Sequence, residues 1–299
     1  MEDNFYAQLE QSFRGERSEI KERLRFYMPF VQSMRKVHPA PRVLDLGCGR
    51  GEWLELLRDL NVQALGVDLS AAMLSDCKRL NLDVEQQDVI SKLNSLEGES
   101  VSIVSAFHLV EHLPFEVLSV MISEAYRVLQ PGGLLIMETP NPDNIQVGTA
   151  NFWLDPTHTR PIPSGLLKLL AQHCGFCNVA VFGLQESSEL RDNRSASLKD
   201  VFLGASPDYA VIAQKAANES ILACFNDAFD RFNGLTTETL IDRYDQRINS
   251  EFSELTQAIA ALNSQISAIH ASTSWKVTYP LRLLSRVLRY IKSKLTGPN

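Results

Sequence analysis

The sequence predicts an α/β fold: a doubly wound, mostly parallel seven-stranded sheet, followed by an α-helical coiled coil and a C-terminal amphipathic helix. Three observations support this fold class. Short apolar segments alternate with helix-like segments from about residue 42 to residue 215, which is typical of βαβ units. A glycine-rich turn follows the first apolar segment. Beyond about residue 217 the alternation stops, and apolar residues recur with heptad spacing.

The N-terminal elements come first in the chain. Apolar residues at spacings of three and four predict a helix over 4–38, which we assign to an N-terminal helical cap at residues 1–38. Residues 39–216 form the predicted sheet domain, whose last two strands are expected to pair as a hairpin. The polar stretches 137–163 and 185–200 predict long loops. The expected strands are 42–46, 63–67, 82–87, 101–106, 133–138, 177–184 and 209–215, and the expected helices are 52–60, 71–79, 115–129 and 164–174.

Residues 217–272 are predicted to be a helical and coiled-coil region. Apolar residues separated by three or four positions, with charged residues between them, make a narrow and long seam. We favour a self-associating coiled coil, and hence a homo-oligomer; the alternative is a helix packed back on the sheet domain. The seam consists of Ile241, Tyr244, Ile248, Phe252, Leu255, Ile259, Leu262, Ile266 and Ile269.

The tail at residues 273–299 differs in charge from the rest of the chain. Its segment SWKVTYPLRLLSRVLRYIKSKL contains six Lys or Arg and no acid, although the formal net charge of the whole chain is −7. Leucines gather on one helical face and arginines on another, which predicts an interfacial helix on an anionic membrane surface. Docking onto a protein such as a glycosyltransferase is the alternative, and the two can coexist. The acidic remainder predicts no nucleic-acid partner.

Cysteine usage and the N-terminus predict a cytoplasmic protein. Five scattered cysteines, an odd number, do not form a disulfide framework, and Cys174-Gly-Phe-Cys177 is a lone CxxC. We therefore expect no metal site. The segment MEDNFYAQLEQ is acidic and polar, unlike a signal peptide, and no run reaches the ~18 apolar residues of a spanning helix.

The run VLDLGCGRGEWLELL (43–57) indicates where a ligand binds. Gly47, Gly49 and Gly51 lie between a strand and a helix, where the backbone must turn sharply and approach a ligand closely. A glycine loop in this position could also bind a nicotinamide dinucleotide. The fingerprint of that class of site is GxGxxG, however, and the spacing here is GxGxG. Asp45 stands just before the loop, and a carboxylate suits a ligand that bears an ammonium group.

Further side chains follow the next strands. Asp68 closes the second strand, where a carboxylate can accept hydrogen bonds from both hydroxyls of a ribose, and Asp88 follows the third, near the expected place of an adenine amino group. Leu69 and Met73 can pack on the adenine face. Each acid could also be a solvated carboxylate at a strand end. The run VSIVSAFHLVEHL then brings Phe107, His108, Glu111 and His112 to the same edge of the sheet.

These residues together resemble the class I S-adenosylmethionine-dependent methyltransferases over about residues 40–215. The resemblance implies a Rossmann-like methyltransferase fold, S-adenosyl-L-methionine as the cofactor, and the three glycines beside its methionine part. It also implies that Asp68 binds ribose and that Asp88 and Val89 face adenine. The resemblance further implies that the N-terminal residues Tyr6, Arg14 and Arg17 fold over the cofactor.

The acceptor is expected to bind against the stretch METPNPDNIQVGTANFWLDPTHTRPIP (137–163). A loop this long in a compact domain is usually functional or disordered. Phe152 and Trp153 beside Asp155 offer an apolar face next to hydrogen-bonding groups, as carbohydrate sites often do, and His158 is a candidate base. In the alternative interpretation Asp155 to His158 form only a turn. The candidate catalytic residues are His158, Asp155 and Glu111.

The run from PNP to NFWLDPTHTRPIPSGLLKLLAQHCGF, with FRGERSEIKERLRFYMPFV (13–31), narrows the resemblance. It is similar to the methyltransferase domain of the chain-terminating enzymes of bacterial O-antigen synthesis. That family implies methylation of a lipid-linked glycan in lipopolysaccharide biosynthesis, peripheral at the inner membrane, on a sugar hydroxyl or on a phosphate added by a kinase domain. The residues after 216 are too few for a kinase domain, which favours the hydroxyl. Two alternatives stay open: a methyltransferase of a small or lipid-soluble metabolite, and a non-catalytic scaffold for a glycosyltransferase.

Overall fold

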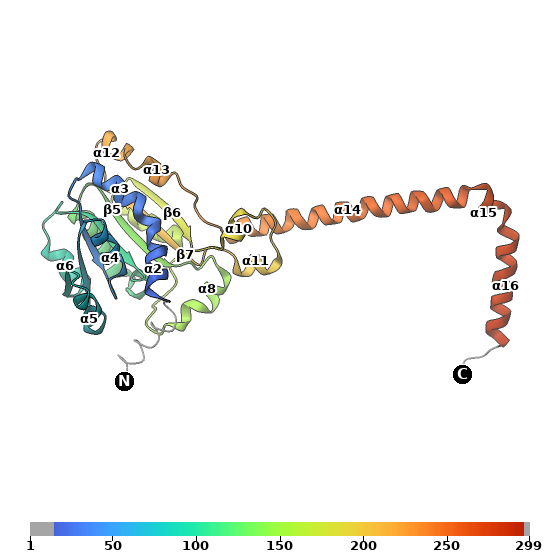
Figure 1. Ribbon diagram of the computed structural model, residues 1–299, viewed down its shortest axis with the longest axis horizontal. Helices are drawn as coiled ribbons and strands as arrows, with labels where there is room; N and C mark the ends of the chain where they lie inside the picture. The colour runs from blue at the N-terminus through green and yellow to red at the C-terminus, as the bar shows by residue number, and fades with distance from the viewer. Residues whose placement is uncertain (1–14, 296–299) are drawn as a thin grey trace. The chain divides into compact units, whose positions relative to one another are not determined.

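The computed structural model describes residues 15–295, and the side chains of residues 15–292 (Figure 1). The chain divides into two compact units, one ending at Asp242 and one beginning at Arg243. The first unit continues past residue 216, where we expected the sheet domain to end. Phe225 and Ala228, which follow that point, are buried in its core because two short helices pack their apolar sides onto it.

The first unit contains the predicted seven-stranded sheet, in the order β3-β2-β1-β4-β5-β7-β6. The first five strands along the chain pair in parallel, whereas β7 is antiparallel to both β5 and β6. The last two strands do pair as a hairpin, but β7 lies between β5 and β6, so β6 is the edge strand. The strands are β1 (Arg42–Leu46), β2 (Gln63–Asp68), β3 (Val84–Gln86), β4 (Val101–Phe107), β5 (Leu129–Pro140), β6 (Asn178–Leu184) and β7 (Asp208–Gln214).

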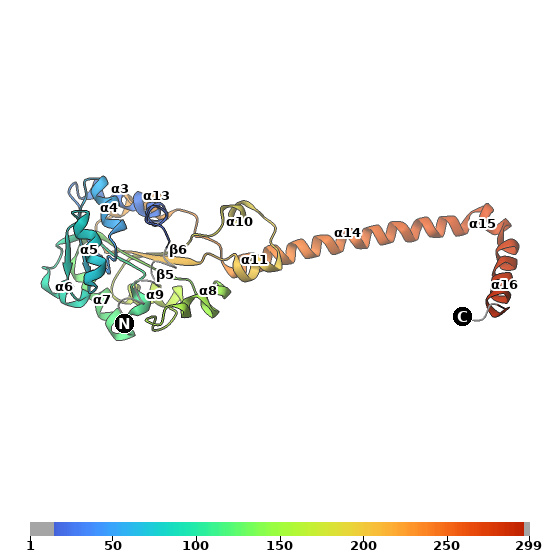
Figure 2. The ribbon, with the colours of Figure 1, turned by 60° about the horizontal axis from the view of Figure 1, so that its bottom comes forward.

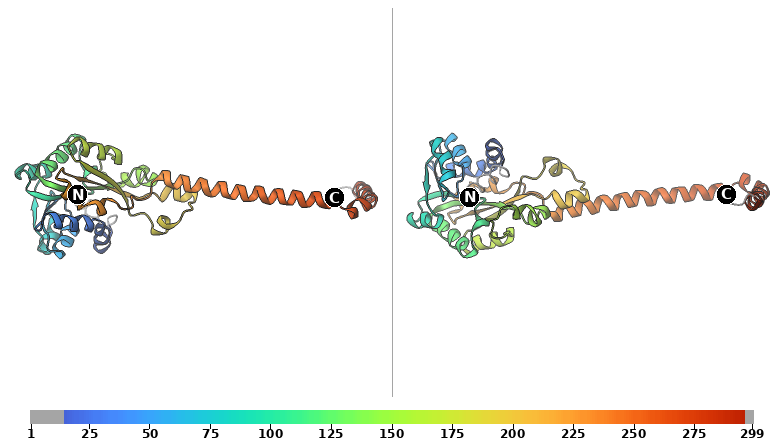
Figure 3. Two further views of the ribbon diagram at one scale, coloured as in Figure 1. Left: turned by 90° about the horizontal axis from the view of Figure 1, so that it is seen from above. Right: turned by 90° about the horizontal axis from the view of Figure 1, so that it is seen from below.

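Helices cover both faces of this sheet, as parallel strands require (Figure 2). On one face lie α2, α3, α4 and α13, and on the other lie α6, α7 and α9. Both views in Figure 3 show the same two layers, with the blue N-terminal helices on one side and the green helices on the other. The bounds are α2 (Arg17–Leu24), α3 (Met28–Val37), α4 (Glu52–Asp59), α5 (Ala71–Arg79), α6 (Val89–Ser95), α7 (Phe115–Val128), α9 (Ser164–His173), α12 (Glu219–Ala223) and α13 (Asn226–Phe229).

The N-terminal helix is interrupted where we predicted it to be continuous. A 3₁₀ turn, η1 (Arg25–Tyr27), separates α2 from α3. Pro29 stands in the first turn of α3, where its missing N–H costs nothing, but within a longer helix it would remove a backbone hydrogen bond. The proline therefore begins a new helix. The first part of the predicted helix, residues 4–14, lies outside the described residues.

Both predicted polar loops contain short helices. The first holds α8 (Ile145–Thr149) and η3 (Asn151–Leu154), and the second holds α10 (Ser188–Asp192) and leads into α11 (Leu198–Leu203). The Asn144 side chain accepts the N–H of Val147, and Ser197 forms a capping box with Asp200. Residues that we took as loop formers therefore act as helix N-caps, which is a common use of Asn and Ser.

The second unit consists of helices. The helix that leads into it, α14 (Thr237–Ala271), is followed by α15 (Thr273–Val277) and α16 (Tyr279–Leu295). From Phe252 to Ile269 the apolar seam of α14 is exposed in the single chain, with 49–65% of each seam residue accessible. Of the helices that the structure describes, none combines the length and the apolar character needed to cross a bilayer. Pairing of α14 into a coiled coil stays a prediction.

Candidate active site

The sheet reverses its strand order at β1, which pairs with β2 on one side and β4 on the other. Leu46 at the end of β1 lies opposite Val67 in β2 and Ala106 in β4, so the three strands end at one edge. A crevice opens at such a switch point because the connecting segments diverge to opposite sides. The predicted site residues that follow these strands are brought together there.

The glycine loop after β1 has the backbone that only glycine adopts easily. The φ angles of Gly47, Gly49 and Gly51 are 67°, 53° and 82°. A Cβ on Gly51 would lie 2.7 Å from Leu82 Cδ1 and 2.8 Å from Cys77 Sγ, so a side chain there has no room. The loop therefore turns directly into α4 and leaves its backbone open to a ligand.

Asp68 at the end of β2 is tied to this loop. Its Oδ2 accepts the N–H of Gly49 at 2.9 Å, and its Oδ1 accepts the N–H of Ser70 at 2.8 Å. A carboxylate has about four acceptor positions, so these two bonds leave capacity for hydroxyl donors of a ligand. Asp68 therefore both shapes the loop and presents negative charge beside it.

A cavity of about 520 Å³ opens next to the loop, within the usual size range of a small-molecule site. Asp45 and Gly47 line it on the loop side. Asp45 is buried and accepts a hydrogen bond from Ser105 Oγ at 2.7 Å. Phe107 lines the same cavity and packs edge-to-face on Trp53, with 5.5 Å between ring centroids. The catalytic candidates Glu111, Asp155 and His158 also line it.

The residues predicted near adenine lie outside this cavity, around the end of β2 and β3. Leu69 is 67% exposed beside Asp68, and Met73 is half-buried in the first turn of α5. Asp88 is the N-cap of α6, where its Oδ1 accepts the N–H groups of Ile90 and Ser91. Val89 is 7% exposed and packs in the core. That Asp88 and Val89 face adenine stays a prediction.

Of the three N-terminal residues expected to fold over the cofactor, the structure describes only one. Tyr6 and Arg14 lie outside the described residues. Arg17 does not line the cavity described above: it donates to Glu55 Oε2 at 2.9 Å and to the Arg50 carbonyl at 3.0 Å. It therefore anchors α2 to α4 through charge-assisted hydrogen bonds.

His108 is held between two carboxylates. Its Nδ1 lies 3.3 Å from Glu111 Oε1, and its Nε2 lies 3.5 Å from Glu138 Oε1. Burial lowers the pKa of His108, but the two carboxylates outweigh burial and hold that pKa well above its usual value. The pKa of the buried Glu111 is correspondingly held below its usual value, because His108 outweighs the effect of burial. His108 is thus a structural cation at the cavity wall.

His158 is oriented by the loop that contains it. Its Nδ1 lies 2.6 Å from the carbonyl oxygen of Phe152, and its ring packs on the Phe152 ring at 4.4 Å between centroids. Because a carbonyl oxygen only accepts, Nδ1 carries the proton of the neutral imidazole, and Nε2 carries the lone pair. Phe152 is buried, so of the predicted aromatic pair only Trp153 offers an exposed face.

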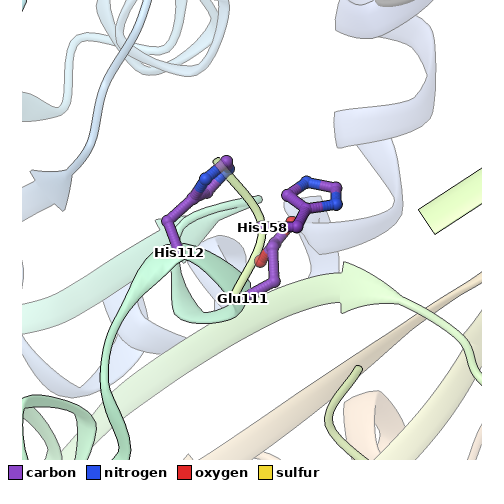
Figure 4. Close-up of side chains that lie close together, drawn as sticks. All are labelled: Glu111, His112 and His158. Carbon is purple, nitrogen blue, oxygen red and sulfur yellow. The ribbon is translucent and has the colours of Figure 1, made fainter. Parts of the chain in front are cut away.

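His112 is oriented by a relay that begins at Asp155. The Thr157 hydroxyl donates to Asp155 Oδ1 at 2.6 Å and lies 2.9 Å from His112 Nδ1. Since its single proton goes to the carboxylate, the hydroxyl accepts from His112, and Nε2 of His112 holds the lone pair. Asp155 thus acts on His112 through Thr157. Glu111, His112 and His158 lie close together (Figure 4).

Sequence reasoning did not select Trp53 or Asp208 for the site. Trp53 is a buried apolar residue of α4 by pattern, yet it lines the cavity, and its indole N–H has no hydrogen-bond partner among the described residues. Asp208 begins β7, and because β7 is antiparallel, its first residue reaches the edge where the parallel strands end. Burial raises the pKa of Asp208 to about 6. From the sequence, we considered only residues that follow strands, and Asp208 begins one, so it was not selected.

The switch-point crevice, the glycine loop and the acids at the strand ends together define an S-adenosylmethionine-dependent methyltransferase. The chain belongs to the methyltransferase domain family, whose sequence profile matches residues 16–181. A solved S-adenosylmethionine-dependent methyltransferase from Archaeoglobus fulgidus is 32% identical, with a TM-score of 0.63; the match covers 71% of this chain and 100% of that one.

Curated relatives match the same region. A probable S-adenosylmethionine-dependent methyltransferase of Mycobacterium tuberculosis is 31% identical over 150 residues, which are 50% of this chain and 54% of the relative. A ubiquinone biosynthesis O-methyltransferase of Nitrosococcus oceani is 28% identical over 105 residues, covering 33% of this chain and 44% of the relative. The chain thus spans about half the length of the curated relatives it matches.

Proposed function

We propose that the chain is an O-methyltransferase that methylates a sugar hydroxyl of a lipid-linked surface glycan, of the O-antigen type, at the cytoplasmic face of the inner membrane. The observation that carries the proposal is the pair His112 and His158. Each has a lone pair on Nε2 by its tautomer, and both line one cavity; Asp155 Oδ2 lies 3.9 Å from Nε2 of His158. A hydroxyl acceptor must lose its proton during transfer, and such nitrogens can promote that loss.

The residues around the loop fit the cofactor, which supplies a sulfonium methyl group for in-line transfer. Asp45 would hold the ammonium group, and the buried Trp53 N–H would gain an acceptor in the carboxylate. Asp68 would accept from the ribose hydroxyls. The adenine would cover apolar surface of the exposed Leu69 and of Met73 and remove it from contact with water.

The acceptor side suits a sugar. Trp153 is 57% exposed, and next to it Leu154 and Asp155 line the cavity, with Asn151 two residues before. Sugars present apolar C–H faces together with hydroxyl groups, so an aromatic face beside an amide and a carboxylate matches them. The histidine pair would then meet the hydroxyl next to the bound cofactor.

A membrane-bound acceptor would account for α16. Leu281, Leu284 and Leu288 on this helix are exposed, and Arg286 and Arg289 are on the same helix. An apolar face and cations on one helix suit the surface of an anionic leaflet. A glycosyltransferase that elongates the glycan is the second proposed partner of this helix, since both would serve the same acceptor.

The exposed seam of α14 supports self-association, and oligomers would bring several α16 helices to one membrane. Replacing Leu255 and Leu262 together by Asp is expected to convert the wild-type oligomer into a monomer, because both residues belong to the seam. Sedimentation velocity measures the change. The matched control, Gln257→Asp with Ser264→Asp, adds the same charge off the seam and is expected to stay oligomeric. A monomeric wild-type chain at micromolar concentration would rule the coiled coil out.

The test of the proposed function is methyl transfer from labelled S-adenosylmethionine to lipid-linked glycan in membranes of the source cells. We expect label on the glycan as an alkali-stable ether. Label in a methyl phosphate would mean that the acceptor is a phosphate, added by a separate kinase, and not a hydroxyl. Label only in a small extractable molecule would favour the second candidate, a lipid-soluble metabolite, which the ubiquinone O-methyltransferase relatives support. No transfer with intact cofactor binding would favour a scaffold.

A further inference from the structure

Glu111, His112 and His158 form a set of potential metal ligands in the acceptor part of the cavity. One carboxylate oxygen of Glu111 and one ring nitrogen of each histidine all lie within 4.8 Å of one another. Figure 4 shows the three side chains gathered at one place. Two imidazoles and one carboxylate are a usual ligand set for first-row transition-metal dications, and they leave coordination positions open. From the sequence, metal binding was considered only at the CxxC motif, which is not part of this site, and no metal was expected.

The hydrogen bonds behind these side chains are those that metal ligands need. A ligating histidine almost always donates its other ring N–H to a backbone carbonyl, a carboxylate or a water. His158 Nδ1 donates to the Phe152 carbonyl at 2.6 Å, and His112 Nδ1 is tied through Thr157 to Asp155. Both rings are therefore held as the tautomer whose Nε2 can bind a cation.

One oxygen of the Glu111 carboxylate has an ion-pair partner but no well-aligned hydrogen bond. Glu111 is 0% exposed; its Oε2 accepts the Thr139 hydroxyl at 2.9 Å, while its Oε1 has no hydrogen-bond partner that meets the usual geometry among the described residues. The nearest cation to Oε1 is His108, at 3.3 Å. His108 offsets part of the cost of burying this carboxylate, and Oε1 keeps acceptor capacity for a second cation.

The second cluster of ligand types in the cavity wall is a poorer candidate. It consists of His108, Glu138 and Asp208. Each ring nitrogen of His108 already faces a carboxylate, Glu111 on one side and Glu138 on the other. No lone pair of that ring is left for a metal. His158 Nε2 also faces a carboxylate, but Asp155 Oδ2 lies 3.9 Å away, beyond hydrogen-bond distance, so His112 and His158 each keep a lone pair.

We propose that Glu111, His112 and His158 bind one divalent transition-metal cation of the manganese-to-zinc series, and that this cation holds the acceptor hydroxyl. The role in transfer rests on the proposed hydroxyl acceptor; the binding of the cation does not. A bound dication lowers the pKa of an oxygen that it holds, so the hydroxyl would lose its proton more readily. The hydroxyl oxygen then forms the new C–O bond as the C–S bond breaks, the electron pair of that bond stays on sulfur as a thioether, and the hydroxyl proton leaves to solvent. His158 is thus a ligand rather than the base itself.

The probe is Mn²⁺, added to the full-length protein after chelator treatment, with the free-ion spin-resonance signal as the readout. We expect one Mn²⁺ per chain, with affinity at least tenfold weaker in His112→Ala and in His158→Ala. Thr157→Val removes only the relay to His112 and is expected to weaken binding about 10- to 100-fold. His173→Ala, an exposed histidine of α9, is the control and should bind as wild type does.

Two results overturn the site: no Mn²⁺ bound by wild type up to millimolar concentration, or unchanged affinity in both histidine variants. The role in transfer is tested separately. Full-rate transfer by the chelated protein would overturn that role and leave the O-methyltransferase proposal standing. Normal Mn²⁺ binding with no methyl transferred to glycan would overturn the proposed acceptor and leave the cation site standing.

Discussion

His158→Ala is expected to lower the turnover number for methyl transfer by about 10²- to 10⁴-fold, the usual worth of a group that promotes proton loss from the nucleophile. The His158 ring is held at Nδ1 by the Phe152 carbonyl, and its ring packs against Phe152 and His112 rather than against the glycine loop. Its removal should therefore leave the affinity for S-adenosylhomocysteine unchanged. His112→Ala should act in the same direction, because its ring lies 4.7 Å from that of His158, centroid to centroid.

Single-turnover transfer from labelled S-adenosylmethionine measures the chemical step, and calorimetric titration of S-adenosylhomocysteine measures the cofactor site. His173→Ala is again the control, because it removes an exposed histidine outside the cavity. Transfer by His158→Ala within a few-fold of wild type would remove His158 from the mechanism. A parallel loss of cofactor affinity would instead indicate a collapsed loop.

Asp68→Ala is expected to abolish measurable methyl transfer through loss of the cofactor. The carboxylate accepts the N–H groups of Gly49 and Ser70 and, in our proposal, two ribose hydroxyls. A hydrogen bond to a charged group contributes about 1.5–3 kcal/mol. Losing two of them to the ligand weakens binding by about 10²- to 10⁴-fold, since 1.4 kcal/mol is a factor of ten.

The affinity for S-adenosylhomocysteine checks this prediction, together with a thermal melt of the variant. Asp76→Ala is the matched control: it removes a carboxylate of α5 whose partner is the exposed Arg79, a kind of pair that contributes little. We expect its affinity to stay near that of wild type. If the Asp68→Ala variant is folded and its affinity for S-adenosylhomocysteine is within threefold of wild type, Asp68 does not have this role.

Much of the cofactor side could be predicted because it depends on local order along the chain. Asp45, the glycine loop and Asp68 each follow directly from the end of a strand, and parallel strands end at one edge. Asp88 illustrates the limit. Its place after β3 was predicted, but its carboxylate oxygen caps α6, a helix that the short apolar pattern around Val89 did not reveal.

Side-chain pairs between distant segments could not be predicted. Tyr27 from η1 donates to Glu138 of β5, and burial together with that carboxylate raises the pKa of Tyr27 well above its usual value. Asp208 reaches the cavity only because β7 enters the sheet antiparallel, between β5 and β6. Neither spacing nor periodicity carries information about which strand a segment will join.

The sequence by itself determined the class of fold, the glycine loop and the acids beside it, because periodicity and turn chemistry act over a few residues. It also determined that the tail is cationic and apolar. Only the tertiary structure decided that Asp155 acts through Thr157 on His112, that Phe152 is buried under His158, and that Glu111 keeps an oxygen without a full partner. The contact between Thr157 and His112 joins positions 45 residues apart in the chain, so it forms only in the folded protein. In the folded protein, each polar atom that becomes buried then needs a hydrogen-bond partner.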